Sequence, residues 1–187
     1  MKKWAGMIGL TLVALLAWAY LARWGEPSVD QPIAFPHKTH VQQLKLNCTN
    51  CHQRAEKDAA AGRPPTALCF ACHAAVEAKN DEMKKVRAFG ESGKEIPWRR
   101  VWRLPAHVFF SHRTHVTVAK VRCQTCHGPM ETLDRPPARP LRKLAMDDCI
   151  GCHEKWEWPK EITEGGTEPV RVAAGRRVST DCYACHR

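Results

Sequence analysis

FPHKTHVQQLKLNCTNCH, residues 35–52, aligns without gaps on FSHRTHVTVAKVRCQTCH, residues 110–127, at a constant offset of 75 residues. Nine of the eighteen positions are identical, and they include one Phe, three His and two Cys in each copy. Self-similarity at a fixed offset marks a repeated structural unit. The sequence of 187 residues therefore predicts two copies of one module.

Each copy ends in Cys-x-x-Cys-His, a motif that occurs five times and uses all ten cysteines of the chain. In this motif both thiols add to porphyrin vinyl groups, and the adjacent imidazole ligates the iron from one face. The motifs predict five covalently bound haem c groups at sites that we number 1 to 5 in chain order: Cys48, Cys51 and His52; Cys69, Cys72 and His73; Cys123, Cys126 and His127; Cys149, Cys152 and His153; Cys182, Cys185 and His186.

Paired cysteines can also form a disulfide framework, a zinc knuckle or a redox-active dithiol. None of the three requires histidine at the position after the second cysteine, which this chain has in all five pairs. Zinc sites would also combine pairs at wider spacings, whereas here one self-contained unit repeats. Haem attachment is the interpretation that the motif favours.

Composition agrees with a haem-filled interior. The chain is rich in Lys, Arg, Pro and Glu after residue 25 and shows no sustained strand-like alternation of apolar and polar residues. We expect a mainly irregular fold with short α-helices and no sheet. Thr66 is predicted to cap a helix that carries Cys69, Cys72 and the Ala-rich run after His73, and Ser179 or Thr180 to cap a last helical turn at site 5.

The formal charge of +10 would suggest an acidic partner if it stood alone. Five haems bring about ten propionate charges, however, which bring the sum close to zero. We therefore expect no nucleic-acid partner, and we expect many Lys and Arg side chains to pair with propionates.

Residues 1–24 are predicted to form a transmembrane anchor, since nineteen uncharged residues run from Trp4 to Ala22. Lys2 and Lys3 precede the run, so the N-terminus is expected in the cytoplasm and the haem domain on the periplasmic side of the cytoplasmic membrane. A cleaved signal peptide is the alternative, because Ala17-Trp18-Ala19 resembles a cleavage site. The length of the apolar run favours a retained single-pass helix.

The rest of the chain divides into a dihaem module at 25–80, a linker at 81–106 and a trihaem module at 107–187. The linker contains the stretch WRRVWR, residues 98–103. Two hypotheses fit this stretch: it docks a partner through aromatic and Arg contacts, or it packs on haem edges and propionates.

Five histidines remain after the five proximal ligands, as many as the remaining axial positions: His37, His40, His107, His112 and His115. Four of them lie in the duplicated Phe-x-His-x-x-His element, where the i,i+3 spacing lets one turn hold two haems. His107 has no counterpart in the first copy, so Met83, Met130 or Met146 stays an alternative ligand for the fifth haem. If every iron has two protein ligands, the chain is an electron carrier and not itself an enzyme.

The Phe-x-His-x-x-His element with its Cys-x-x-Cys-His motif resembles the cytochrome c3 and c7 family, from Phe35 to His153. The resemblance implies that His37 serves site 1, His112 serves site 3, and His40 and His115 serve sites 2 and 4. The chain departs from the c7 pattern in having no His between Gly128 and Cys152. His107 is therefore our candidate distal ligand for the last haem.

The anchor, the five sites and the stretch IPWRRVWRLPAHVFFSHRTHV, residues 96–116, resemble the pentahaem subunit of alternative complex III. That resemblance implies an electron-transfer subunit of a quinol-oxidising respiratory or photosynthetic complex. Its expected partners are an iron–sulfur protein, polytopic quinol-binding subunits and a monohaem cytochrome. The alternatives are a partner of another membrane oxidoreductase, or a haem-based reductase with one open haem site.

Overall fold

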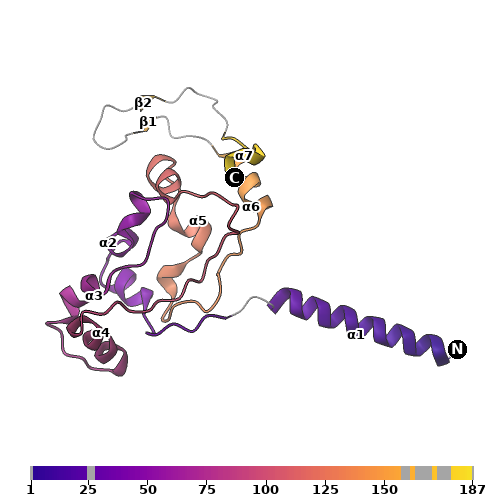
Figure 1. The fold of residues 1–187 in the computed structure, drawn as a ribbon, viewed down its shortest axis with the longest axis horizontal. Coiled ribbons are helices and arrows are strands. Elements are labelled where there is room, and N and C mark those ends of the chain that lie inside the picture. Colours follow the sequence, from indigo (N-terminus) through magenta and orange to yellow (C-terminus); the bar gives the residue numbers. More distant parts are fainter. Residues whose placement is uncertain (1, 25–27, 157–160, 163–169, 172–177, 187) are drawn as a thin grey trace.

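The computed structural model describes residues 2–24, 28–156, 161–162, 170–171 and 178–186. Parts of both predicted modules, at residues 25–27, 157–160, 163–169, 172–177 and 187, lie outside this set. Figure 1 shows short helices joined by irregular segments, with the long helix α1 extending away from the body that carries the attachment sites.

Each attachment motif lies on a short helix. The five helices are α2 (Cys48–Cys51), α3 (Thr66–His73), α5 (Cys123–His127), α6 (Met146–Lys155) and α7 (Cys182–Cys185). Helical geometry places residues i and i+3 on one face, so both cysteines of a motif point to the same side. The prediction of a mainly irregular fold with short α-helices is confirmed.

The predicted helix caps differ from those observed. Thr66 is the first residue of α3 and not its cap, because its amide and its hydroxyl both donate to a Glu95 carboxylate oxygen, at 2.9 and 3.0 Å. That carboxylate takes the place of a cap at the helix N-terminus. Helix α3 also ends at His73, so the Ala-rich run that follows does not extend it.

The last helix, α7, likewise begins differently from the prediction of a Ser179 or Thr180 cap. Asp181 is the N-cap, and its side chain accepts a hydrogen bond from the amide of Tyr183 at 3.2 Å. Aspartate is among the strongest N-cap residues, and it is the residue that directly precedes the helix. Ser179 instead accepts a hydrogen bond from the Asp181 amide, at 3.2 Å.

Helix α4 (Asp81–Glu91) occupies the first part of the predicted linker and packs against α3. A Cβ atom added at Gly90 would lie 2.2 Å from Cδ2 of Phe70, so only glycine allows this close approach. The Ile96 amide then donates to the Thr66 hydroxyl at 2.8 Å. Residues 81–96 are therefore folded onto the first module.

Very little apolar side-chain surface is buried. Among the described residues, the buried hydrophobic ones are Ile33, Ala55, Ile96 and Ala119, and no side chain is more than 98% buried. A domain of this size normally buries far more of its surface. The protein chain thus forms a shell around space that its own side chains do not fill, as the composition predicted.

Two further features complete the fold. A two-residue strand, β1 (Glu161–Ile162), pairs antiparallel with β2 (Val170–Arg171), a small sheet that the sequence did not predict. Helix α1 spans Lys2–Trp24. Within the part of the chain that the structure describes, no helix has the length and apolar character needed to cross a membrane.

Candidate haem-binding sites

The two copies of the repeated element fold alike. Each forms a turn of π-helix, η1 (Thr39–Gln43) in the first copy and η3 (Thr114–Val118) in the second. Two residues after the end of each turn comes a lysine with positive φ, Lys45 or Lys120, both at 57°. The offset of 75 residues found in the sequence therefore corresponds to a repeated backbone conformation.

A phenylalanine packs against both distal histidines of each copy. The Phe35 ring lies edge-on to His37, with centroids 4.9 Å apart, and stacks on His40 at 4.3 Å. Phe110 repeats these contacts in the second copy at the same centroid distances. Phe thus fixes the two imidazoles of each copy at different angles. No function was predicted for Phe35 or Phe110, although phenylalanine occupies the same position in both copies of the repeat.

Three distal rings face three proximal rings at nearly one spacing. The centroid distances are 6.2 Å for His40 and His73 of site 2, 6.3 Å for His112 and His127 of site 3, and 6.1 Å for His115 and His153 of site 4. A metal ion bound to two imidazole nitrogens at about 2 Å each leaves the ring centroids roughly 6 Å apart. The spacing therefore fits an iron between each pair.

At site 5 the rings of His107 and His186 stack with centroids 5.3 Å apart. The contact follows from backbone pairing, since Val108 forms a β-bridge with His186 and the Phe109 amide donates to the Cys185 carbonyl at 2.6 Å. The prediction that His107 belongs with site 5 thus corresponds to two rings that the structure brings together. Met146, one of the alternatives, is 62% exposed.

At site 1, His37 and His52 are neighbours. Burial first, and then the nearby His52 and His40 rings, lower the pKa of His37 to about 4. Burial also lowers the pKa of His52 and His127. These shifts favour neutral imidazole, which is the form that ligates a metal.

Hydrogen bonds to backbone carbonyls orient several of the rings. Nδ1 of His40 donates to the Pro36 carbonyl at 2.9 Å, and Nδ1 of His115 donates to the Ser111 carbonyl at 2.8 Å. Nδ1 of His153 donates to the Ser179 carbonyl at 3.0 Å. A carbonyl can only accept, so Nδ1 carries the proton and Nε2 is left to bind a metal.

The thiols do not have the properties that the alternative uses require. All ten cysteines are unpaired, although a disulfide framework would join them. Burial raises the pKa of the Cys51, Cys69 and Cys126 thiols, whereas a redox-active dithiol relies on a lowered pKa. The described residues contain no cluster of three or more Cys, His, Asp or Glu side chains, the arrangement on which a zinc site depends.

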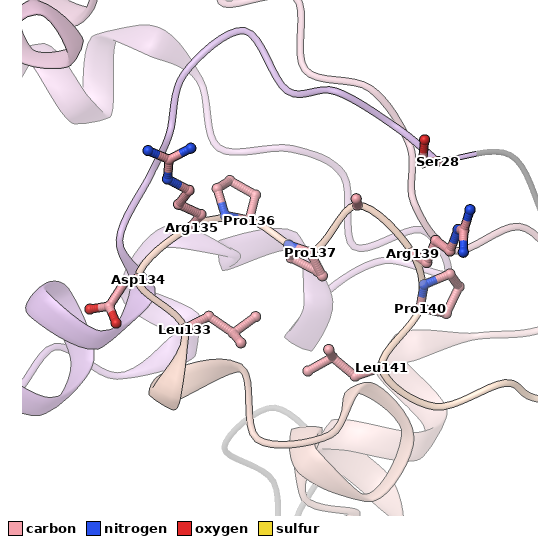
Figure 2. Close-up of a pocket in the computed structure, with 10 residues that line it drawn as sticks. Ser28, Leu133, Asp134, Arg135, Pro136, Pro137, Arg139, Pro140 and Leu141 are labelled. Atoms are coloured by element: carbon pink, nitrogen blue, oxygen red, sulfur yellow. The ribbon is translucent and has the colours of Figure 1, made fainter.

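A cavity of about 720 Å³ lies beside site 3, within the Pro- and Arg-rich loop of the second module. Figure 2 shows Leu133 and Leu141 pointing toward each other inside the loop, whereas the Arg135 and Arg139 guanidinium groups point away. Leu141 also packs on Gly128, the residue after His127: a Cβ added there would lie 3.1 Å from Leu141 Cβ. The loop thus offers apolar contacts for a macrocycle and charged groups for propionates.

The stretch 98–103 packs against the body of the protein. Trp102 lies edge-on to His127 of site 3 with centroids 4.7 Å apart, and the Trp98 carbonyl accepts a hydrogen bond from Arg63. The Arg99 amide donates to the Gln31 side chain at 3.0 Å. These contacts favour the hypothesis of packing over that of partner docking.

Imidazole pairs carried by Cys-x-x-Cys-His helices, around an interior with little protein core, define a multihaem c-type cytochrome. Residues 33–90 and 108–187 match the family described as cytochrome c7 and related cytochrome c, and the chain belongs to this family. It binds haem c covalently, and it is an electron-transfer protein rather than a catalyst.

A similar protein is known from Nitratidesulfovibrio vulgaris, where it is named the multiheme cytochrome c subunit of menaquinone reductase. The two chains are 30% identical over 203 aligned positions, which cover 96% of this chain and 88% of the relative. The similarity thus extends over both modules and the segment between them.

Proposed function

We propose that the chain carries five haem c groups and transfers electrons within a quinone-linked membrane complex. The observation that carries this proposal is that each proximal imidazole has a second imidazole beside it. Bound haem supplies one-electron redox chemistry. The chain would hold each haem through the two cysteines of a motif, its adjacent histidine and a second histidine.

The proposed ligand pairs follow the ring contacts at sites 2 to 5 and, at site 1, the electrostatic influence of His52 on His37. Sites 1 to 5 use, in this order, His37 with His52, His40 with His73, His112 with His127, His115 with His153, and His107 with His186. Such a set leaves no coordination position for a substrate. The pairing therefore speaks against the alternative of a haem-based reductase, which needs one open site.

Membership of a quinone-linked complex has two supports. The relative is named as a subunit of menaquinone reductase, and the sequence resembles the pentahaem subunit of alternative complex III. We propose the partners that such a complex requires: an iron–sulfur protein, polytopic quinone-binding subunits and a monohaem cytochrome. A single helix is too little to build a quinone pocket, so we assign the quinone reaction to a partner subunit.

The direction of electron flow has two candidates. The resemblance to alternative complex III favours quinol oxidation, whereas the name of the relative favours menaquinone reduction. Purification of the tagged chain from its native membrane, followed by mass spectrometry of the bound subunits, tests the complex. Adding menaquinol to the oxidised complex, or menaquinone to the reduced complex, then gives the direction from the change in haem absorbance. Purification of the chain without any membrane partner would contradict the proposal.

We further propose that the N-terminal segment, residues 1–24, holds the chain at the cytoplasmic membrane, with the haem modules on the periplasmic side. Support comes from the nineteen uncharged residues between Lys3 and Arg23 and from large apolar side chains of α1 that are exposed, such as Trp4 at 70% and Leu10 at 74%. Replacing residues 1–24 with a cleavable signal should give a haem protein in the soluble periplasmic fraction. A mature N-terminus near Tyr20 in the unmodified protein would contradict retention.

A further inference from the structure

The contacts between the attachment sites place them in single file, and we propose that their spatial order is 2, 1, 3, 4, 5. This order differs from their order along the chain, and it makes sites 2 and 5 the two ends of the electron path. The inference rests on the ligand pairs of the proposed function. It concerns how one site adjoins the next, which the motifs alone do not specify.

Sites 1 and 2 are joined by the first copy of the Phe-x-His-x-x-His element, residues 35–40. His37 and His40 lie three residues apart and both contact Phe35, while their partner rings belong to site 1 and site 2. An i,i+3 pair on one helical turn has Cβ atoms about 5–6 Å apart. The thiols of Cys51 and Cys72 are also close enough to influence each other electrostatically. Sites 1 and 2 are therefore neighbours.

Sites 3 and 4 are joined in the same way by the second copy of the element, residues 110–115. His112 and His115 both contact Phe110, and their partner rings belong to sites 3 and 4. Electrostatic coupling between the Cys126 and Cys152 thiols repeats the relation found between sites 1 and 2. Each copy of the repeat thus holds one adjacent pair.

The two pairs meet through sites 1 and 3. The segment that follows His52 receives backbone hydrogen bonds from η3 and the residues before it: the His112 amide donates to the Ala59 carbonyl at 2.9 Å, and the Arg113 amide donates to the Asp58 carbonyl at 3.1 Å. The Thr117 hydroxyl donates to the Glu56 carbonyl at 2.7 Å. The first site of each module therefore adjoins the other.

Site 5 lies next to site 4, at the end of the row of sites. Nδ1 of His153 donates to the carbonyl of Ser179, which lies three residues before the first cysteine of site 5. The Cys149 and Cys185 thiols are also electrostatic neighbours. In Figure 1, α3 with α4 and α7 lie at opposite sides of the body, with α2, α5 and α6 between them. Partners that donate and accept electrons would thus meet two separate surfaces.

The order can be tested with light-driven electron injection. The haem thioethers consume every native cysteine, so an added cysteine is the one thiol that a ruthenium photosensitiser can label. Val76→Cys places the label next to site 2, and Thr180→Cys places it next to site 5; Val76 is 48% exposed and Thr180 is also exposed. The excited label loses one electron to the nearest site and regains one from a sacrificial amine in solution. Each later transfer oxidises one site and reduces the next.

One site at a time is then marked by replacing its distal histidine with methionine, which raises the potential of that site and gives it a distinct spectrum. The five marker variants are His37→Met, His40→Met, His107→Met, His112→Met and His115→Met. The measurement is the time at which the electron reaches the marked site. From the Val76→Cys label, the arrival times should increase in the order 2, 1, 3, 4, 5. From the Thr180→Cys label, the order should be reversed.

An arrival at site 3 before site 1 from the Val76→Cys label, or the same order from both labels, would overturn the inference. Each variant is first checked for five haems by mass. A second measurement needs no ligand change: in the reduced protein, gadolinium(III) chelates attached at Val76→Cys and Thr180→Cys should lie farther apart than those attached at Val76→Cys and Lys57→Cys. The opposite result would also overturn the order. A wild-type chain with fewer than five haems would instead contradict the proposed function.

Discussion

The two copies of the Phe-x-His-x-x-His element share their backbone but differ in how the first histidine is held. Nδ1 of His37 is buried and has no hydrogen-bond partner among the described residues. Nδ1 of His112, at the equivalent position, donates to the Ala59 carbonyl of the first module at 3.0 Å. The second module thus depends on the first for the orientation of a ligand. The hydrogen bond between the modules therefore helps to orient a ligand of site 3.

The copies also differ in what surrounds their second sites. In the first module, α4 packs on α3, and Gly90 allows contact with Phe70. In the second, the Pro- and Arg-rich loop leads into α6, and its Ala138 carbonyl accepts a hydrogen bond from the Val29 amide at 2.8 Å. The contacts of Phe with the two distal histidines are nevertheless the same in both copies. The comparison teaches that the Phe-x-His-x-x-His element is constant, while the elements that support the second site of each module vary.

The largest effect should come from removing the haems altogether. With so few apolar side chains buried, neither module has a core of its own, so both should fail to fold without haem. The chain produced without haem attachment should show no cooperative thermal transition by circular dichroism, whereas the mature chain should show one. A cooperative transition in the haem-free chain would contradict the haem-filled interior.

Site 5 has no counterpart in the comparison, and His107→Ala tests its ligand. The substitution should open one iron of the chain to carbon monoxide and produce a high-spin signal from that site alone. Absorbance titration of the reduced protein should give one carbon monoxide per chain. Met146→Leu and Met83→Leu are matched controls that should bind none. If a methionine variant opens the iron and His107→Ala does not, the ligand assignment is wrong.

The helix pair that distinguishes the first module can be disrupted by Gly90→Ala. The added methyl would collide with Phe70, and such overpacking costs about 1–3 kcal/mol in the free energy of unfolding. Gly93→Ala is the control: its Cβ would meet no atom within 4 Å, so only the strain of a positive φ of 66° applies, about 1 kcal/mol. Denaturant unfolding should rank Gly90→Ala as the more damaging change.

The variants His112→Ala and His37→Ala test whether the different hydrogen bonding of these two histidines affects the free energy of unfolding. Both should open one iron to carbon monoxide. Only His112→Ala also removes the hydrogen bond to the Ala59 carbonyl, so it should destabilise the chain by about 1 kcal/mol more. The free energies of unfolding of the two variants measure this difference directly. Equal values would mean that the contact between modules does not depend on this ligand.

The smallest effect concerns the ion pair between Lys38 of the first module and Asp134 of the second, 3.6 Å apart with side-chain exposures of 43% and 75%. Exposed pairs of this kind contribute less than about 1 kcal/mol. Asp134→Asn should change the free energy of unfolding by less than about 0.5 kcal/mol. A clearly larger loss would show that charge pairing, as well as backbone hydrogen bonding, holds the modules together.

The sequence predicted the features that depend on local spacing. The helices at sites 2 and 5 were predicted, and the 75-residue repeat in the sequence corresponds to a repeated backbone conformation. His107 was assigned to site 5 by counting the remaining histidines, and its ring stacks on that of His186. Features that depend on distant residues were missed. Glu95 replaces a cap at Thr66 although it lies 29 residues away, and the approach of α4 to α3 depends on a single glycine. Contacts between residues that are distant in the chain produce no regular pattern in the sequence.

The central claim is that five irons each lie between two histidines. Near-infrared magnetic circular dichroism of the oxidised chain tests it most directly, because the energies of the charge-transfer bands identify the axial ligands of each low-spin ferric haem. We predict that bis-histidine bands account for all the iron, with five irons per chain by elemental analysis. A histidine–methionine band, a high-spin band, or fewer than five irons would contradict the claim.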